Sequence, residues 1–205
     1  RGDVAAVSGG GYAYLFKADL FLSTLRFPFS TDKESTDGSV KFTGVGTIID
    51  DSLNLVSAQN EVLDLGSNAF QFGTDKGFVV EFDAKITDTS VEAVVLNINS
   101  DLFNVEISNY SSSLWQKIHV HSTDTNRAIS FTSYAVYSGS WNVFKHFKYM
   151  YSHVTKNART YLNGVETGNV SAATEIQYLP TPTNVNMISY TNKFHIKNLT
   201  FRVID

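Results

Sequence analysis

Short runs of alternating apolar and polar residues make up most of the chain, separated by clusters of glycine, asparagine, aspartate and serine. In 141–154, for example, Phe147, Tyr149 and Tyr151 share one parity and the residues between them share the other. Side chains of a β-strand point to opposite faces in turn, so this alternation predicts strands that bury one face. The spacing of such runs predicts about 12 to 14 short strands.

Turn signals predict that neighbouring strands pair as antiparallel hairpins. Asn163-Gly164 is the strongest of them, because a type I′ turn needs a positive φ at both central positions and these two residue types tolerate it. A polar turn is also expected at Lys156-Asn157, and Asp50-Asp51 marks another. Further hairpins are predicted to join 91–98 with 103–108 and 114–122 with 128–137.

Two segments leave a choice between helix and strand. In 12–29 some apolar residues have helical spacing, but the abundant aromatics favour one or two strands. In 55–65 a short helix stays open as an alternative to a strand. Residues 1–11 are small and glycine-rich, so they are expected to form a flexible lead-in. One domain is expected over 12–205.

Composition narrows the class of protein. Aromatic residues make up 13% of the chain and charged residues 18%, the formal net charge is -4, and cysteine is absent. A disulfide framework and a thiolate metal site are therefore excluded. The charge balance gives no global attraction to nucleic acid. No run of 18 apolar residues occurs, so no membrane insertion is expected. The lack of an initial Met predicts a fragment or a processed chain.

One stretch carries a family resemblance. Residues 141–168 contain a strand that begins with Trp, a polar turn and then Tyr-Leu-Asn-Gly-Val. This order resembles a hairpin of laminin G-like domains, which belong to the concanavalin A-like lectin/glucanase jelly rolls. Segments 69–86, 102–110 and 193–205 follow in the family's order, although Lys197-Asn198 stands where family members usually have a small residue. The resemblance implies an all-β, two-sheet antiparallel jelly-roll sandwich, which the strand spacing also predicts.

The resemblance says more about fold than about function, because this architecture hosts lectins, adhesins, structural modules and glycan-cleaving enzymes. The low charge and the Asn/Ser/Thr-rich composition look similar to those of laminin G-like modules of bacteriophage tail and capsid-surface proteins. The expected function is a non-catalytic binding module of a virion or extracellular surface protein. Its expected partners are a host or cell-surface glycan, or a receptor, and other chains of a larger assembly.

Candidate ligand residues follow from the chemistry of sugar binding. A sugar needs an aromatic ring for its apolar face and amide or acid groups for its hydroxyls. The candidate set, taken from expected loops, is Tyr110, Asn142, Tyr178 and Tyr190. Trp141 is expected in the core instead, since it begins a strand. The alternative is a structural or protein-interaction module without a glycan site, marked by an apolar surface patch such as 12–29.

Calcium is a further expectation that the resemblance implies, because laminin G-like and lectin sandwiches often hold it with loop oxygens. Calcium prefers six to eight oxygen ligands. The closest fragment to such a ligand run is Asp124-x-Asn126. Zinc has weaker support: His119-x-His121 puts two imidazoles on one strand face, but no third ligand is evident.

The remaining alternative is a polysaccharide-degrading enzyme, which needs two carboxylates on one face. Glu61-x-x-Asp64 has the wrong parity for a strand. Glu81-x-Asp83 has the right parity, but Lys85 stands where a third acid would lie. A lyase of the Gln-x-His type is disfavoured too, because two residues separate Gln and His in 116–119 and place them on opposite faces. The sequence therefore favours binding over catalysis.

Overall fold

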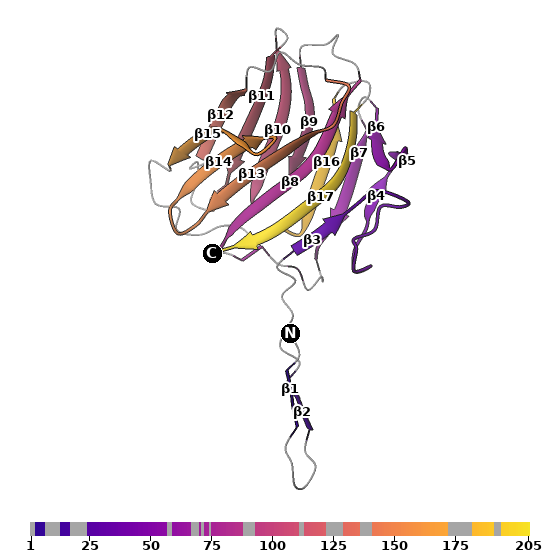
Figure 1. Cartoon of the computed structure of the whole chain (residues 1–205), viewed down its shortest axis with the longest axis vertical. Helices are drawn as coiled ribbons and strands as arrows, with labels where there is room; N and C mark the ends of the chain where they lie inside the picture. Colours follow the sequence, from indigo (N-terminus) through magenta and orange to yellow (C-terminus); the bar gives the residue numbers. More distant parts are fainter. Residues whose placement is uncertain are drawn as a thin grey trace.

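The computed structural model describes residues 3–6, 13–16, 24–56, 59–66, 70, 72–73, 75–87, 93–110, 113–121, 129–135, 141–171, 182–190 and 194–205. Within these residues all regular structure is β-strand and no helix occurs. Two antiparallel sheets face each other as a sandwich, which confirms the predicted jelly-roll-like fold (Figure 1). A separate two-stranded sheet pairs β1 (Asp3–Ala6) with β2 (Ala13–Phe16).

The eight-stranded sheet has the spatial order β15-β14-β13-β8-β17-β6-β5, and β3 pairs with β17 outside this order. Its strands are β3 (Thr24–Phe27), β5 (Thr47–Ile49), β6 (Ser52–Leu55), β8 (Gly77–Ile86), β13 (Lys145–Ser152), β14 (Asn157–Leu162), β15 (Val165–Ser171) and β17 (Phe194–Ile204).

The seven-stranded sheet has the spatial order β12-β11-β10-β9-β16-β7-β4. Its strands are β4 (Phe42–Gly44), β7 (Asn60–Asp64), β9 (Ala93–Asn99), β10 (Phe103–Tyr110), β11 (Ser113–Val120), β12 (Ile129–Ala135) and β16 (Asn184–Ser189). The predicted pairings of β9 with β10 and of β11 with β12 are confirmed.

Alternating burial builds the core between the two sheets. In β13 the inward residues Phe147, Tyr149 and Tyr151 are at most 1% exposed, as the sequence pattern predicts. Phe82 of β8 stacks on Phe147 with ring centroids 5.5 Å apart. Trp141 is partly buried and packs against this core, which agrees with its expected role. Aromatic rings that pack in this way bury large areas, so they supply much of the hydrophobic free energy of folding.

The turns follow the predicted chemistry. Asn163 and Gly164 have φ values of 50° and 80° between β14 and β15, as a type I′ turn requires. Asp50 and Asp51 have φ values of 50° and 53° between β5 and β6. Lys156 also has a positive φ, 52°, in the predicted turn before β14. Local turn residues therefore set the hairpin registers in this sandwich.

The two ambiguous segments form strands where the structure describes them. The alternative of a helix in 55–65 is wrong, because β7 pairs along its length with β16. In 12–29, β2 and β3 are strands, and 17–23 lie outside the described residues. Leu25, Phe27 and Phe29 are 1%, 0% and 0% exposed, so this part of the segment belongs to the core. The side chains of 12–23 lie outside the described residues, so the apolar surface patch of the structural-module alternative stays a prediction there.

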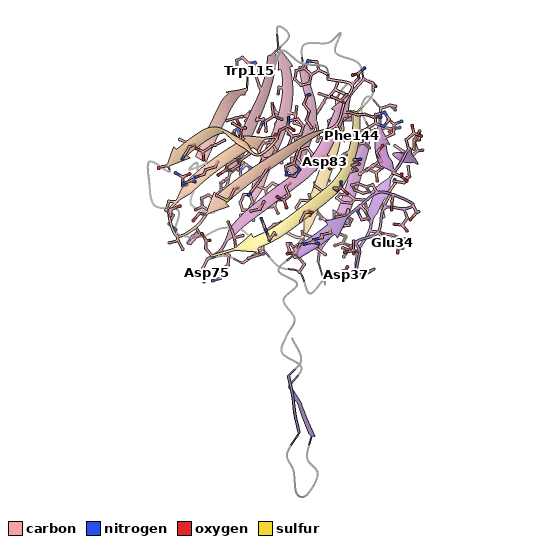
Figure 2. The ribbon with its side chains drawn as sticks, viewed as in Figure 1. Glu34, Asp37, Asp75, Asp83, Trp115 and Phe144 are labelled. Atoms are coloured by element: carbon pink, nitrogen blue, oxygen red, sulfur yellow. The ribbon has the colours of Figure 1, made fainter. Side chains whose placement is uncertain are left out.

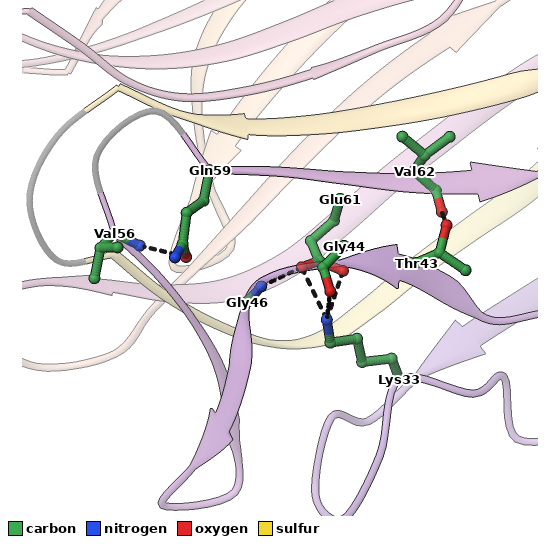
Figure 3. A network of polar contacts seen from close by, with 8 residues as sticks. All are labelled: Lys33, Thr43, Gly44, Gly46, Val56, Gln59, Glu61 and Val62. Atoms are coloured by element: carbon green, nitrogen blue, oxygen red, sulfur yellow. Dashed lines mark hydrogen bonds and ion pairs between the residues drawn. The ribbon is translucent and has the colours of Figure 1, made fainter.

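One charged group is buried where β4 passes into β5 (Figure 3). Glu61 of β7 is 0% exposed, and its two carboxylate oxygens accept hydrogen bonds from Lys33 Nζ at 2.9 and 2.8 Å. Lys33 Nζ also donates to the carbonyl of Gly44 at 3.0 Å, and Gly46 N donates to Glu61 Oε1 at 2.5 Å. The ion pair therefore ties the loop before β4 to β7 and to the β4–β5 corner.

Glycine is required at this corner because the backbone approaches the carboxylate closely. A Cβ atom on Gly46 would lie 2.7 Å from Glu61 Oε1 and 2.7 Å from Leu55 Cδ2. A Cβ on Gly44 would lie 2.7 Å from Glu61 Cδ. Neither contact is compatible with the observed packing, since neither the buried carboxylate nor the core leucine has room to move.

Candidate functional site

The predicted ligand residues that the structure describes lie at one end of the sandwich. β9 is antiparallel to both β10 and β16, so the last residues of β10 and β16 reach the same edge. Tyr110 ends β10, and Tyr190 follows β16 with 50% of its surface exposed. Asn142 is exposed and precedes β13, and the carbonyl of the residue before it accepts a hydrogen bond from Ile86 N. Ile86 pairs with Phe194, at the end where the chain passes from β16 to β17.

Tyr178, Asp124 and Asn126 lie outside the described residues, so their predicted roles stay predictions. β15 ends and β16 begins at the end of the sandwich opposite to Tyr110. β11 ends and β12 begins at that opposite end too. Among the described residues, no three acidic, histidine or cysteine side chains gather as a metal site.

A polar surface on the outer face of the seven-stranded sheet was missed by the sequence analysis. In β10 Asn104 and Glu106 point outward, because Phe103, Val105 and Ile107 are at most 1% exposed on the inner side. The strand registers bring further polar residues beside them on β9 and β11. We call this surface the asparagine face, and its members are Asn97, Asn99, Asn104, Glu106, Trp115, Lys117 and His119.

Amide side chains on this face are ordered by hydrogen bonds. Asn97 Nδ2 donates to Asn104 Oδ1 at 3.0 Å, and Asn99 Nδ2 donates to Asn97 Oδ1. Asn97 is only 7% exposed, so its nearly buried amide fixes the positions of the Asn104 and Asn99 side chains. Within the described residues, Asn104 Nδ2 and Asn99 Oδ1 have no hydrogen-bond partner. The row therefore presents one donor group and one acceptor to solvent or to a ligand.

Charge on the asparagine face is nearly balanced. Lys117 Nζ lies 3.8 Å from Glu106 Oε2, and Ser108 Oγ donates to Glu106 Oε1 at 2.5 Å. Burial and the positive charge of Lys117 lower the pKa of His119. Its imidazole is therefore neutral at pH 7 and supplies one hydrogen-bond donor and one acceptor. The face thus combines donors and acceptors without a strong net charge.

Trp115 adds an aromatic surface to this polar set. It pairs with Ser108 of β10, next to Glu106 along the face, and lies toward the upper end of the sandwich in Figure 2. The indole is partly buried, so it is anchored by packing and still offers surface to solvent. An indole beside amides is the combination that suits the apolar face and the hydroxyls of a sugar.

The structure describes both pairs of acidic residues that the catalytic alternatives offered. Glu61 is buried and Asp64 is exposed, which confirms that they face opposite sides. Glu81 and Asp83 share a face, but Asp83 accepts a hydrogen bond from His146. Glu106 is the one carboxylate among the residues that define the asparagine face, and Asp64 of β7 lies three strands away from it. Glycoside hydrolysis needs carboxyl groups about 5 to 9.5 Å apart.

The two histidines predicted as neighbours do lie together. The rings of His119 and His121 are 6.4 Å apart between centroids. Burial lowers the pKa of both imidazoles, so both are neutral at pH 7. No third ligand completes a zinc site among the described residues. Gln116 is 0% exposed on the inner side, opposite to His119, as the sequence parity predicted.

Comparison with known proteins identifies the fold. The chain matches no protein-family model and no curated protein. Its fold is shared with solved binding domains of botulinum neurotoxins. The binding domain of neurotoxin DC in complex with rat synaptotagmin II has a TM-score of 0.65 and 12% identity, covering 89% of this chain and 48% of that chain. The serotype D binding domain has a TM-score of 0.65 and 13% identity, covering 88% and 48%.

A third neighbour comes from a study in which cell entry of botulinum neurotoxin type C depends on interaction with two ganglioside molecules. Its TM-score is 0.65 at 13% identity, covering 90% of this chain and 49% of that chain. This chain therefore spans about half the length of these domains. At such identities the likeness defines an all-β sandwich and leaves the ligand to be argued from this chain's own residues. The described residues contain no helix long and apolar enough to cross a membrane.

Proposed function

We propose that this chain is a non-catalytic glycan-binding module of a larger extracellular or virion surface protein. The asparagine face is its proposed binding surface. The observation that carries the proposal is the grouping of ordered amides, a neutral imidazole and a partly buried indole on one sheet face. Asn104 Nδ2 and Asn99 Oδ1 would meet sugar hydroxyls, and Trp115 would pack on the apolar side of a sugar ring.

Further observations support a binding role and its setting. The structural neighbours are receptor-binding domains, one in complex with synaptotagmin II and one that depends on gangliosides for cell entry. The resemblance of 141–168 to laminin G-like domains supports a module within a longer protein. The low charge and the Asn/Ser/Thr-rich composition support a bacteriophage virion as one setting. Membership of the sandwich in the concanavalin A-like superfamily is part of the same proposal. The asparagine face as defined holds one carboxylate, Glu106, whereas hydrolysis needs two, which supports binding rather than hydrolysis.

Recognition on a flat sheet face buries few atoms, so affinity for one glycan is expected to be about millimolar and to rise by multivalency in an assembly. Calcium at Asp124 and Asn126 stays part of the proposal. The loop residues Tyr110, Asn142, Tyr178 and Tyr190 form the alternative binding surface for the same function.

A glycan array with calcium and with chelator is the first test, followed by titration of the strongest glycan against variants. Asn104→Ala and Lys117→Ala alter the asparagine face without opening the core. Asn169→Ala, an exposed asparagine on β15 of the other sheet, is the matched control. The asparagine face predicts at least a tenfold loss of affinity for each of the first two variants and less than a twofold change for Asn169→Ala.

Each outcome of the array has a distinct meaning. Full affinity in Asn104→Ala and Lys117→Ala, with loss in Asn142→Ala or Tyr190→Ala, would move the site to the loops. Loss of binding in chelator would support the calcium prediction at Asp124-x-Asn126. A blank array at high protein density would reject glycan binding for the glycans printed and favour a structural module.

A further inference from the structure

The outer face of the eight-stranded sheet carries a second polar group. Phe144 is partly buried just before β13 and lies near Asp83 of β8 (Figure 2). Lys197 Nζ lies 4.3 Å and Lys85 Nζ 5.0 Å from the centroid of the Phe144 ring. Both contacts are favourable cation–π interactions, but the two ammonium groups are within about 9 Å of each other and repel. The ring thus holds two like charges close together.

Asp83 lies beside these lysines, and both of its oxygens accept hydrogen bonds from other side chains. Its Oδ1 accepts a hydrogen bond from His146 Nδ1 at 2.9 Å, and its Oδ2 accepts one from Asn198 Nδ2 at 2.7 Å. The ion pairs found among the described residues include neither Lys85 nor Lys197. An acidic group from outside the chain would therefore supply the ion-pair partner that both ammonium groups lack among the described residues.

A cleft opens next to this group. Its volume is about 340 Å³, and Arg26, Pro28, Thr36, Glu81, Asn198 and Thr200 line it. The size is at the lower end of small-ligand pockets. A guanidinium, a carboxylate, an amide and two hydroxyls converge there, while the proline ring offers an apolar wall. Asn198 joins the cleft to the lysine group, because it lines the cleft, bonds to Asp83 and follows Lys197 in the chain.

An irregularity in β17 borders the cleft. The register between β17 and β8 shifts between Lys197 and Thr200, and Asn198 has a φ of 53°. Asparagine tolerates this left-handed conformation better than most residues. Leu199 is 0% exposed and stays in the core, whereas Asn198 is exposed. The bulge thus turns one amide outward, which is a common use of bulges at functional sites.

We propose that this surface is a second ligand site, for a saccharide that carries a carboxylate or sulfate group. The sugar ring lies in the cleft against Pro28, and its hydroxyls bond to Arg26, Glu81 and Asn198. The acidic substituent lies between the ammonium groups of Lys85 and Lys197. This site is on the sheet opposite to the asparagine face, so it stands whether or not the asparagine face binds glycans.

Charge supports an acidic ligand on this face of a chain whose net charge is -4. The outward residues around the cleft and along β8, β13 and β17 are mainly basic: Arg26, Lys85, Lys148, Lys197 and Arg202 against Glu81 and Asp83. The two carboxylates interrupt the basic surface, which disfavours the continuous phosphate backbone of a nucleic acid. A small ligand with one acidic group fits this pattern better.

Calorimetric titration of the intact chain tests the proposal with three probes: a uronic acid-containing disaccharide, its neutral carboxyl-reduced form and inorganic sulfate. The variants are Lys85→Gln/Lys197→Gln and Asn198→Gly, in which glycine keeps the positive φ and removes the amide. Lys148→Gln is the matched control, because Lys148 Nζ lies 5.2 Å from the centroid of Tyr161 on the same face. Thermal unfolding confirms that each variant is folded.

We expect the acidic disaccharide to bind most tightly, with an affinity that falls as salt rises. Lys85→Gln/Lys197→Gln should lose about tenfold in affinity for it and leave the neutral form unchanged. Asn198→Gly should weaken both disaccharides, and Lys148→Gln should change neither by more than twofold. The proposal would be overturned if the acidic and neutral disaccharides bound equally tightly, or if sulfate alone bound as tightly as the acidic disaccharide. A loss in Lys148→Gln equal to that in Lys85→Gln/Lys197→Gln would also overturn it. Loss of glycan binding in asparagine-face variants alone would leave it intact.

Discussion

The buried ion pair of Glu61 and Lys33 provides the sharpest test of how this fold is held together. Lys33→Met removes all three hydrogen bonds of Lys33 Nζ, two of them to the Glu61 carboxylate. The carboxylate is 0% exposed and keeps only the hydrogen bond from Gly46 N at 2.5 Å among those described. A buried charge without its partner is strongly destabilising, because water can no longer solvate it.

The cost is expected to be about 3 kcal/mol, the lower end of the range for broken buried pairs. The lower end applies because the Lys33 side chain is 18% exposed, so water reaches part of the site. A domain of this size loses about 2 to 4 °C in Tm for each kcal/mol. Lys33→Met should therefore lower the Tm by about 6 to 12 °C, measured by circular dichroism and by urea unfolding.

The double variant separates the buried charge from lost packing. Glu61→Gln removes the charge but keeps an oxygen that accepts from Gly46 N. Lys33→Met/Glu61→Gln should thus recover at least half of the stability that Lys33→Met loses. Lys41→Met, at an exposed lysine, should change stability by less than about 0.5 kcal/mol. If the effects of Lys33→Met and Glu61→Gln simply add, the uncompensated buried charge is not the cause of the loss.

Three other predictions concern turns and pH. Gly164→Ala should lower stability by about 1 kcal/mol, because alanine is strained at a φ of 80°. The added Cβ meets nothing within 4 Å, so the loss comes from the backbone alone. An unchanged urea midpoint would contradict this. Asp51→Gly should raise stability by about 0.5 kcal/mol, because glycine relieves a φ of 53° in the turn between β5 and β6. A lower Tm would argue against this prediction. Burial lowers the pKa of His119, His121 and His195, so below about pH 6.5, the ordinary pKa of histidine, the unfolded chain binds more protons than the folded one and stability should fall. His119→Gln/His195→Gln should flatten that dependence in a pH series of urea melts.

Local chemistry made much of the fold predictable. The alternation in β13 predicted which residues enter the core. Asn163-Gly164 predicted a hairpin because both residue types tolerate a positive φ. Both signals need only near neighbours in the chain. The segment 55–65 was ambiguous for the same reason: its spacing fits either period, and only pairing of β7 with β16 from far along the sequence makes it a strand.

The candidate sites depended on contacts that no local pattern contains. The outward parity of Asn104 is readable in the sequence, but its register beside Asn99 and His119 is set by three strands. Likewise Phe144, Lys85 and Lys197 come from separate parts of the chain and meet only across the eight-stranded sheet.

The sequence by itself determined that this protein is an all-β sandwich with specific hairpins, because alternation and turn residues act within a few positions along the chain. Tertiary structure alone decided that Glu61 is a buried structural charge while Asn104 is a surface amide. Both are polar residues in alternating strands, and no local signal separates them. The physical reason is that burial and electrostatic pairing depend on which strands become neighbours, and long-range packing of the two sheets settles that choice.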